Sequence, residues 1–497
     1  MEIISKFFTK RTVVICCVAV IILGAVARVR YYLADISFWI DEAAVALNVL
    51  NKSFAELLQP LDYNQVAPVG FCILEKAAIS LLGNNEFAFR LLPFVAGIVA
   101  IWLTFCFTRK AIGILPALLC AAQLSISTEI LFFANCLKPY ASDLTIAVGL
   151  MLLAWKDDPG GLSPRRLAAL GLCGLLAVWF SFPAIFILGG IGTLWMVDWI
   201  RFKNRRLFLW YCTVILLWLA SFYLHFQFLQ SQTHSEGILD FWANSFMPFP
   251  PKNFDDLKFF IVELPRVFRN CIWTSDQIVA VVLFGAGCLL LWRNHRRLLV
   301  LTIIPLLLNL FASALHKYPF GGRMLQYGAL NLFIPIAVTL DYLLAWGSKM
   351  KWVRVVAILL IIANLGEPAV NTAKGIFIPR KREQMKQLVA FLVDHPARIS
   401  SYFAHQPGYS NFSYYANRYR LNIAGLTLSP TLDKTKLDHY PPELASLHGD
   451  IWLIFGHAKQ HRKIDYEKYY VQSAQMRARL VEKFTDVGVA AYLFRFD

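Results

Sequence analysis

Long apolar blocks run along the chain from residue 12 to about residue 368 and then thin out. A transmembrane helix needs about 20 mainly apolar residues, and eleven segments approach that length. The pattern therefore predicts a polytopic α-helical membrane protein with about eleven transmembrane helices. Their expected positions are 12–33, 91–108, 113–133, 143–155, 167–183, 184–200, 207–227, 277–292, 298–315, 326–346 and 353–368.

The segment 68–82 is also apolar, but it is short and carries Glu75 and Lys76. We expect it to lie at the membrane interface or to re-enter, as an interfacial helix of the first outer loop. If it does not span and the N-terminus is cytoplasmic, every basic cluster falls inside, as the positive-inside rule requires. A spanning 68–82 would put them all outside. The clusters are Arg109-Lys110, Arg165-Arg166, Arg201 to Arg206, Arg293 to Arg297 and Lys349 to Arg354.

The tail after the last apolar block has a different pattern. Segments with helical periodicity alternate with short apolar runs typical of strands, which predicts a small α/β domain. We expect helices at 380–393 and 466–483, and strands at 398–404, 451–456 and 489–496. An odd number of spans brings this tail to the outer face. The chain is thus divided into a membrane domain, 1–369, and an extracytoplasmic domain, 370–497.

Composition supports a membrane location. Only 16% of the residues are charged, against about a quarter in ordinary soluble domains. The 48 Lys and Arg exceed the 32 Asp and Glu, and the net charge of +16 suits basic cytoplasmic loops and anionic lipid headgroups. No zinc-finger spacing, basic helix or RNA-binding signature points to nucleic acid. The ten cysteines contain no C-x-x-C and predict neither a disulfide framework nor a zinc site.

Asp41 and Glu42 follow the first span closely, in the outer loop 34–90, beside the apolar side chain of Trp39. Carboxylates in such a setting suit a general base, because desolvation raises a carboxylate pKa toward the useful range. The pair equally suits a solvated helix start, since acidic residues favour the first turn of a helix. Position alone does not decide between these interpretations.

A second candidate cluster surrounds the short outer loop 134–142. It contains Lys138 before a proline, followed by Tyr140 and Asp143. A lysine at a proline-fixed turn between two spans can meet a lipid phosphate as a point charge. The alternatives are a snorkelling lysine at a helix end and an aspartate that caps the next helix.

A third candidate cluster lies in the outer loop 316–325. His316, Lys317 and Arg323 offer three cationic or donor groups, and Gly321 and Gly322 allow the backbone to approach a ligand closely. An arginine there could clamp a phosphate through two hydrogen bonds. The alternative is a turn with ordinary flanking charges.

A fourth candidate is the run Asp62-Tyr63-Asn64-Gln65, with Arg90 at the far end of the same loop. Its Asn, Gln and Tyr side chains suit hydrogen bonding to sugar hydroxyls, although they equally suit any wet loop. The scattered histidines show no metal-ligand spacing. The sequence therefore requires no cofactor, and a Mg²⁺ or Mn²⁺ ion held by Asp41 or Glu42 together with a donor phosphate stays open.

Together these segments resemble the GT-C membrane glycosyltransferases, and within them the bacterial protein O-mannosyltransferase-like family that includes the aminoarabinose transferases of lipid A. The resemblance is strongest over 35–155, returns near 316–335, and is only architectural in the tail. Relatives often carry an acidic residue where this chain has Asn135. The matching features are Asp41-Glu42, Ala67 to Phe71, Gly83 to Pro93, Lys138-Pro-Tyr140 and Tyr318 to Arg323.

The resemblance implies an inverting transfer of a hexosyl or pentosyl group from a polyprenyl-phosphate-sugar donor to a glycan, lipid or protein hydroxyl at the outer face. Asp41 would accept the proton of the acceptor hydroxyl, and Glu42 would orient the acceptor or a metal. The donor phosphate would be held by Lys138, Arg323, Lys317 and His316. The sugar or acceptor would be held by Tyr140, Asp62, Gln65, Arg90 and Asp143.

Two other functions remain open from the sequence. A transporter or lipid flippase would place ionisable residues near the bilayer midplane, often on inverted repeats. A non-catalytic assembly or receptor subunit would use the tail for binding. A bacterial inner membrane with the candidate residues facing the periplasm fits the charge pattern best, although an ER membrane would obey the same charge logic.

Overall fold

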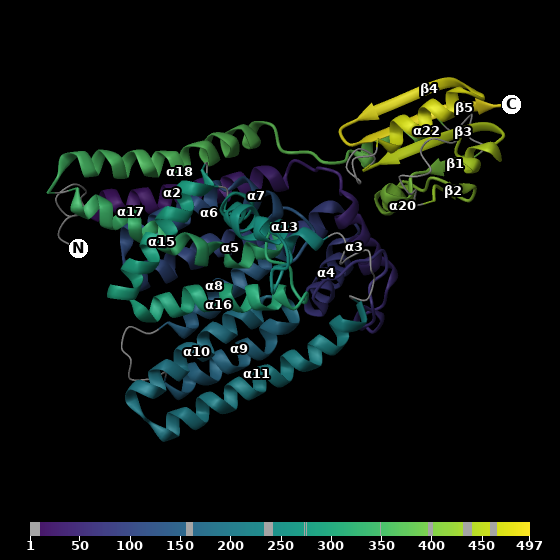
Figure 1. The fold of residues 1–497 in the computed structure, drawn as a ribbon. Helices are drawn as coiled ribbons and strands as arrows, with labels where there is room; N and C mark the ends of the chain where they lie inside the picture. Colours follow the sequence, from purple (N-terminus) through teal and green to yellow (C-terminus); the bar gives the residue numbers. More distant parts are fainter. Residues whose placement is uncertain are drawn as a thin grey trace.

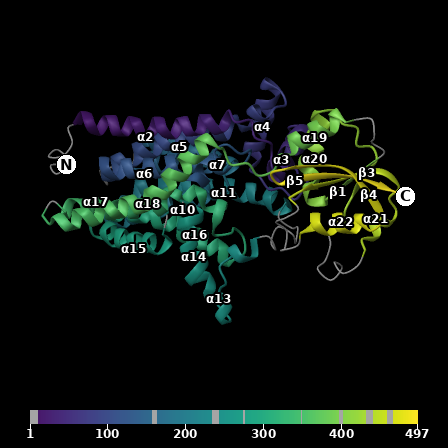
Figure 2. The ribbon, with the colours of Figure 1, turned by 90° about the horizontal axis from the view of Figure 1, so that it is seen from above.

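The computed structural model describes residues 10–155, 163–232, 242–272, 274, 276–347, 349–395, 401–430, 440–457 and 465–497. Long helices lie side by side and form most of the molecule, and a small sheet domain lies at one end of them (Figure 1). The described N-terminal helix starts at the opposite end. The same separation is seen from above (Figure 2).

Twelve helices make up the main body of the described chain. They are α2 (Lys10–Tyr32), α5 (Glu86–Ile112), α6 (Ile114–Ile126), α7 (Thr128–Phe133), α8 (Tyr140–Ala154), α9 (Pro164–Phe180), α10 (Ala184–Phe202), α11 (Arg205–Gln232), α15 (Gln277–Asn294), α16 (Arg296–Ala314), α17 (Ala329–Trp346) and α18 (Lys351–Phe377). The last of these, α18, continues past the expected domain boundary at 369/370.

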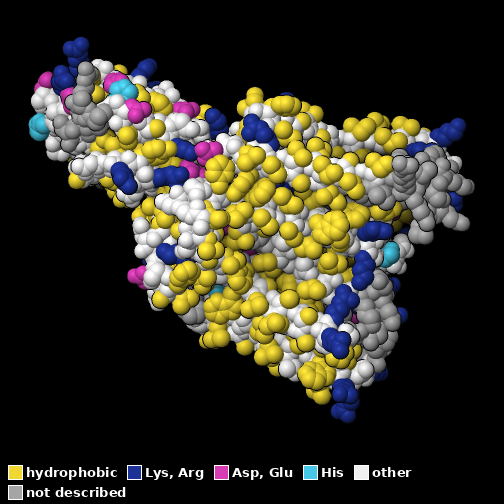
Figure 3. Space-filling model, turned by 180° about the vertical axis from the view of Figure 1, so that it is seen from behind, with side chains coloured by type: hydrophobic (Ala, Val, Ile, Leu, Met, Phe, Trp, Pro, Cys, Tyr) yellow, Lys and Arg dark blue, Asp and Glu magenta, His cyan; other side chains and the backbone are white. Residues whose placement is uncertain are grey.

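The surface of these helices suits a lipid environment. Within the described residues, seven helices are long and apolar enough to cross a membrane, and two shorter ones, 114–126 and 140–154, are also apolar. Hydrophobic side chains cover most of the face in Figure 3, and many Lys and Arg side chains of the helical part lie far from the sheet domain. The count of eleven spans stays a prediction.

Two predicted boundaries in the helical part are wrong. The apolar stretch 113–133 is not one helix, because Ser127 adopts an extended backbone and separates α6 from α7. The loop expected at 134–142 is also shorter, since α8 begins at Tyr140. Hydropathy alone shows neither break, because the residues on both sides are apolar.

Short helices connect the long ones, and two of them, α3 (Ile40–Asn51) and α4 (Val69–Leu82), lie between the long helices and the sheet domain (Figure 1). The segment 68–82 forms α4, whose 14 residues rise only about 21 Å, less than the hydrocarbon thickness of a bilayer. The other short helices are η1 (Glu56–Leu58), η2 (Ala243–Ser245), α13 (Phe254–Lys258), η3 (Phe259–Glu263), α14 (Leu264–Asn270) and η4 (Gly322–Gly328).

The sheet has the order β2-β1-β3-β5-β4, with β2, β1 and β3 parallel and β5 and β4 antiparallel to their neighbours. The small α/β domain is thereby confirmed. The predicted helix 466–483 is too long, because it ends at Gln475 and a strand follows. The elements are α19 (Met385–Asp394), β1 (Ser401–Ala404), η6 (Gln406–Gly408), α20 (Tyr409–Arg418), β2 (Leu426–Leu428), α21 (Pro442–Ala445), β3 (Gly449–Gly456), α22 (Tyr466–Gln475), β4 (Ala478–Asp486) and β5 (Val489–Phe496).

The two faces of the sheet have different neighbours. Side chains alternate along β3, so Leu453 packs with α22, whereas Trp452 packs with α19 and α20. The second of these clusters continues into α3, α4 and α5 through residues such as Phe38 and Phe71. One hydrophobic core therefore joins the sheet domain to the outer helices and fixes their relative position.

Candidate active site

The acidic pair lies in the first turn of α3. Asp41 is bound to Arg323 of η4, with 2.8 Å between the carboxylate oxygen Oδ2 and the guanidinium nitrogen Nη1. Each of these two side chains is 17% exposed, so the ion pair is only partly sealed from solvent. Gly322, directly before Arg323, has a φ of +50°, a conformation that favours glycine and lets the chain turn at this point.

Aromatic rings surround the guanidinium of Arg323. Its carbon Cζ lies 5.4 Å from the ring centroid of Trp39, 6.0 Å from that of Tyr140 and 5.3 Å from that of Trp242. Such rings attract a cation and exclude water from around it. Three segments far apart in the sequence thus contribute rings to one arginine.

Lys138 is the second cation near Asp41. It lies in the turn between α7 and α8 and is only 5% exposed. Its Nζ donates to Oε1 of Gln65 at 2.6 Å. Because Gln65 is neutral, this bond orients the ammonium group and leaves its positive charge available to an anion. We call Asp41, Lys138 and Arg323, with the rings of Trp39, Tyr140 and Trp242, the Asp41 cluster.

The charges of the cluster change the titration of its members. Burial by itself would raise the pKa of Asp41, but Lys138 and Arg323 outweigh burial and lower that pKa below the usual aspartate value. The expected increase in the pKa of Asp41 is therefore wrong. Burial also lowers the pKa of Lys138, and Asp41 opposes this effect.

Glu42 has quite different surroundings. Its side chain is 1% exposed and binds Arg90 through both oxygens, at 2.9 Å from Nε to Oε1 and 2.7 Å from Nη2 to Oε2. Oε1 also accepts the backbone N–H of Leu137 at 2.7 Å. Glu42 therefore holds the turn that presents Lys138, rather than facing a substrate.

Arg90 belongs to the same buried pair. Besides Glu42 it donates to the backbone carbonyl of Ile36 at 2.6 Å, so it fixes the segment that enters α3. Glu86, one turn earlier on α5, binds Arg418 at 3.2 Å and Lys386 at 3.5 Å, both in the C-terminal domain. The charged residues of the motif 83–93 thus join α5 to the segment that enters α3 and to the C-terminal domain.

The other predicted site residues divide into two groups. Tyr140 and Asp143 lie in the first turn of α8, three residues apart and therefore on one side of the helix, with Tyr140 beside Arg323. Asp62 forms a surface ion pair with Lys52 at 3.1 Å, and its side chain is 65% exposed. His316 and Lys317 are exposed as well, and the His316 ring packs on Phe246 at 5.0 Å. These last three contact none of the groups of the Asp41 cluster through a described interaction.

Sequence reasoning missed three contributors. Trp39 and Trp242 were not assigned to a site, and neither was Arg382, whose Cζ lies 4.2 Å from the Trp39 ring centroid. The basic run 380–382 after the last apolar block was the only signal for Arg382. Nothing in the sequence relates that run to Trp39.

The donor groups present do not fit a divalent cation. Both oxygens of Glu42 are occupied by Arg90, and one oxygen of Asp41 is bound to Arg323. Across the described ranges, no three His, Cys, Asp or Glu side chains gather as a cation site.

No protein-family model and no curated protein matches the sequence. Solved structures do resemble the fold. The ArnT of Cupriavidus metallidurans, bound to undecaprenyl phosphate, superposes with a TM-score of 0.55 at 14% identity, over 95% of this chain and 97% of that one.

A second relative in structure is archaeal. The oligosaccharyltransferase AglB of Archaeoglobus fulgidus, in complex with an inhibitory peptide and a dolichol-phosphate, matches with a TM-score of 0.51 at 12% identity, over 96% of this chain and 74% of that one. Both neighbours are GT-C membrane glycosyltransferases, so the predicted GT-C fold is confirmed.

Proposed function

We propose that this chain is an inverting membrane glycosyltransferase that moves a sugar from a polyprenyl-phosphate donor to an acceptor hydroxyl. The observation that carries the proposal is that Asp41, Lys138 and Arg323 come together beside aromatic rings in a GT-C fold. A carboxylate next to two cations offers both a proton acceptor and a binding place for a phosphate. The undecaprenyl phosphate bound to the Cupriavidus ArnT supports this class of donor.

In the proposed reaction the acceptor oxygen attacks the anomeric carbon of the sugar from the side opposite the phosphate. The bond from the anomeric carbon to the phosphate oxygen breaks, and the phosphate leaves with the electron pair. Asp41 takes the proton of the acceptor hydroxyl. Lys138 and Arg323 stabilise the negative charge that grows on the departing phosphate. Attack opposite the leaving group inverts the configuration at the anomeric carbon.

Lys138 and Arg323 lower the pKa of Asp41, and this makes its carboxylate a weak base as long as it alone compensates their charge. An incoming phosphate competes with Asp41 for Arg323 and Lys138 and compensates their charge. Donor binding therefore raises the basicity of Asp41, which couples proton transfer to occupancy of the donor site.

The remaining candidate residues have supporting roles in this proposal. Glu42 and Arg90 position the turn of Lys138, and Gln65 orients the ammonium group. Tyr140 and Asp143 contact the sugar or the acceptor from the first turn of α8. Asp62 has no role in the reaction.

The proposed orientation is that of an inner-membrane protein with a cytoplasmic N-terminus and a periplasmic C-terminal domain. The Asp41 cluster then faces the periplasm, because α3, the α7–α8 turn and η4 lie next to that domain. A transporter would instead place such charges along a path through the bilayer midplane. The gathering of the cluster at the sheet-domain end of the helices favours the transferase.

Mass analysis of lipid-linked sugars and outer-surface glycans, in cells with and without the protein, tests the proposal. We expect a glycan or lipid to lose one sugar unit in the deletion strain and a lipid-linked sugar to accumulate. Complementation with wild-type chain should restore both, and complementation with Asp41→Asn should restore neither. Unchanged glycans and lipid-linked sugars in the deletion strain would contradict the proposal.

A further inference from the structure

The linker between α18 and α19, residues 378–384, passes the N-terminus of α3. Its Glu383 is buried, and Oε2 accepts the backbone N–H of Ile40 at 3.0 Å and the side-chain amide of Asn411 at 2.6 Å. Ile40 directly precedes Asp41. The linker is therefore fixed to the same helix turn that carries the proposed base, and Arg382, which directly precedes Glu383, is held close to that turn.

Arg382 is a partly buried cation on which the Glu129 carboxylate acts only from a distance. Its Cζ lies 4.2 Å from the ring centroid of Trp39 and 4.7 Å from that of Phe132, and burial lowers the pKa of its guanidinium. No carboxylate of the described chain forms an ion pair with it. Arg380, two residues earlier, is bound to Glu129 at 2.7 Å. A half-buried charge is costly unless an anion compensates it, so Arg382 calls for an anionic ligand.

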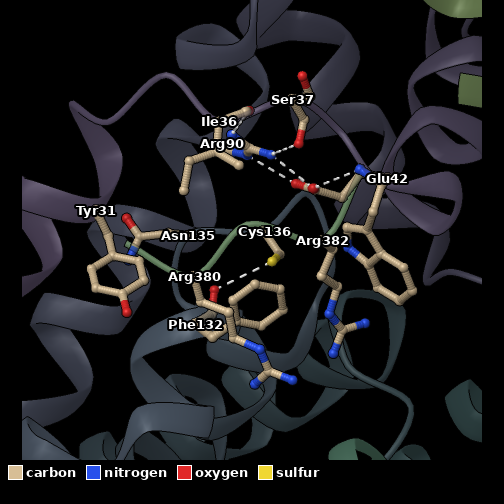
Figure 4. A pocket seen from close by; sticks show the side chains of 11 residues that line it. Tyr31, Ile36, Ser37, Glu42, Arg90, Phe132, Asn135, Cys136, Arg380 and Arg382 are labelled. Atoms are coloured by element: carbon tan, nitrogen blue, oxygen red, sulfur yellow. Dashed lines mark hydrogen bonds and ion pairs between the residues drawn. The ribbon is translucent and has the colours of Figure 1, made fainter. Parts of the chain in front are cut away.

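A small cavity lies beside Arg382, shown from close by in Figure 4. The side chains of Arg380 and Arg382 lie side by side there, and Asn135 and Cys136 come from the turn of Lys138. Two buried polar atoms of its lining lack a hydrogen-bond partner within the described structure, namely Nε1 of Trp39 and Oδ1 of Asn135. These residues are only 5% and 6% exposed. A buried indole N–H without a hydrogen-bond partner, beside a guanidinium that forms no ion pair with the described residues, is a donor set for an anionic oxygen.

We propose that Arg382 and the indole N–H of Trp39 bind the phosphate of the lipid carrier. The Trp39 ring also lies 5.4 Å from Cζ of Arg323, so the Asp41 cluster and Arg382 meet at one side chain. This inference rests on the proposed function and extends its donor site onto the linker of the C-terminal domain. It also fits the charge balance, since a carrier released as a phosphate monoester carries more negative charge than the sugar-linked donor.

Binding of undecaprenyl phosphate to the purified full-length chain in detergent micelles, followed by microscale thermophoresis, tests the inference. We expect Arg382→Gln to raise the Kd at least about tenfold, as for the loss of a charge-assisted hydrogen bond. Lys381→Gln is the matched control, because it removes the same charge one residue earlier from an exposed side chain and should leave the Kd unchanged. Arg382→Lys should lie between wild type and Arg382→Gln.

Trp39→Phe gives an independent variant, since it keeps a ring for both arginines and removes only the indole N–H. It should weaken binding several-fold with an unchanged thermal midpoint. Equal affinities of Arg382→Gln, Trp39→Phe and wild type would overturn the inference while leaving the proposed function standing, because transfer by wild type and its loss in Asp41→Asn are measured separately. An equal loss of affinity for phosphatidic acid would overturn the assignment to the carrier.

Discussion

Asp41 and Glu42 are neighbours in sequence, but their surroundings differ in almost every respect. Successive residues of an α-helix are turned by about 100°, so the two carboxylates point to different parts of the molecule. Asp41 meets Arg323 and Lys138 in a partly open, ring-lined cluster. Glu42 is sealed with Arg90 and a backbone N–H. Under the proposed function the adjacent acidic residues therefore have two tasks, chemistry for Asp41 and assembly of the site for Glu42.

The difference is also one of charge balance. The Glu42–Arg90 pair is neutral, and its oxygens have no capacity left for a ligand. The Asp41 cluster has one carboxylate and two cations, so it carries an excess positive charge that a phosphate can compensate. The neutral Glu42–Arg90 pair is therefore suited to a structural role. The Asp41 cluster, with its excess positive charge, is suited to binding an anion.

Asp41→Asn is the change with the largest expected effect on activity. The amide keeps the size of the side chain but cannot accept the acceptor proton, so we expect kcat for sugar transfer to fall about 10²- to 10⁴-fold. The measurement is sugar transfer by purified protein with the lipid-linked donor found by mass analysis. Thermal unfolding of the variant should stay close to that of wild type.

Asp62→Asn is the matched control for this variant. It makes the same chemical change in the same outer loop, at a carboxylate that is 65% exposed and paired only with Lys52. Its turnover should equal that of wild type. If Asp41→Asn turned over like Asp62→Asn, Asp41 would not be the base. Asp41 and Glu42 would then differ in their surroundings but not in a catalytic role.

Glu42→Gln should have the opposite effect to Asp41→Asn, because it should mainly lower the stability of the protein. Removing one member of a buried ion pair leaves Arg90 uncompensated, so we expect a loss of about 3–5 kcal/mol in the free energy of unfolding. Thermal or denaturant unfolding in detergent, followed by tryptophan fluorescence, measures the loss. Glu56→Gln, at an exposed carboxylate, should cost far less. A stable Glu42→Gln without activity would instead place Glu42 in the chemistry.

Much of the fold could be predicted from the sequence because its signals are local. Apolar blocks mark the long helices, and alternating patterns mark strands such as 451–456 of the C-terminal sheet. The break at Ser127 escaped prediction because its neighbours on both sides are apolar. The strand 478–486 escaped it because exposed edge positions such as Arg479 and Glu482 carry charges that suit a surface helix equally well.

The candidate site was predictable only in part. Asp41, Lys138 and Arg323 each lie in a loop that the charge pattern predicts to be extracytoplasmic, and the direct pairing of Asp41 with Arg323 follows from the tertiary structure alone. The buried ion pair of Glu42 could not be predicted, because its partner, Arg90, is 48 positions away in the sequence. Trp242 had no signal of its own, and the basic run that contains Arg382 is not specific, since such a run in a loop has many uses. Position in the chain identifies candidates, and burial with partners decides their roles.

The role of Lys138 in the Asp41 cluster can be tested by the pH dependence of donor use. Only the protonated lysine compensates a phosphate, and burial lowers its pKa from the ordinary value of 10.5. We therefore expect kcat/KM for the donor to fall as pH rises through a value below 10.5. In Lys138→Arg the side chain stays charged, so this alkaline decline should move to higher pH.

Lys138→Gln should raise the KM for the donor about tenfold and leave the KM for the acceptor nearly unchanged. Gln65→Leu removes only the hydrogen bond that orients the ammonium group. It should also raise the KM for the donor, but by a smaller factor. Equal increases for donor and acceptor would argue against a phosphate-binding role. A pH profile identical in wild type and Lys138→Arg would exclude Lys138 as the group that titrates.

His316 and Lys317 should give the smallest effects, although the sequence alone places them beside Arg323. Both side chains are exposed, and the His316 ring rests on Phe246. A solvated surface charge contributes at most about 1 kcal/mol to the binding of an anion. His316→Ala and Lys317→Ala should therefore change the Kd for undecaprenyl phosphate far less than Arg323→Ala, and the residual effect of Lys317→Ala should disappear at high salt because exposed charges are screened. A loss at Lys317 as large as that at Arg323, persisting at high salt, would mean that the outer loop 316–325 closes over the donor as one unit.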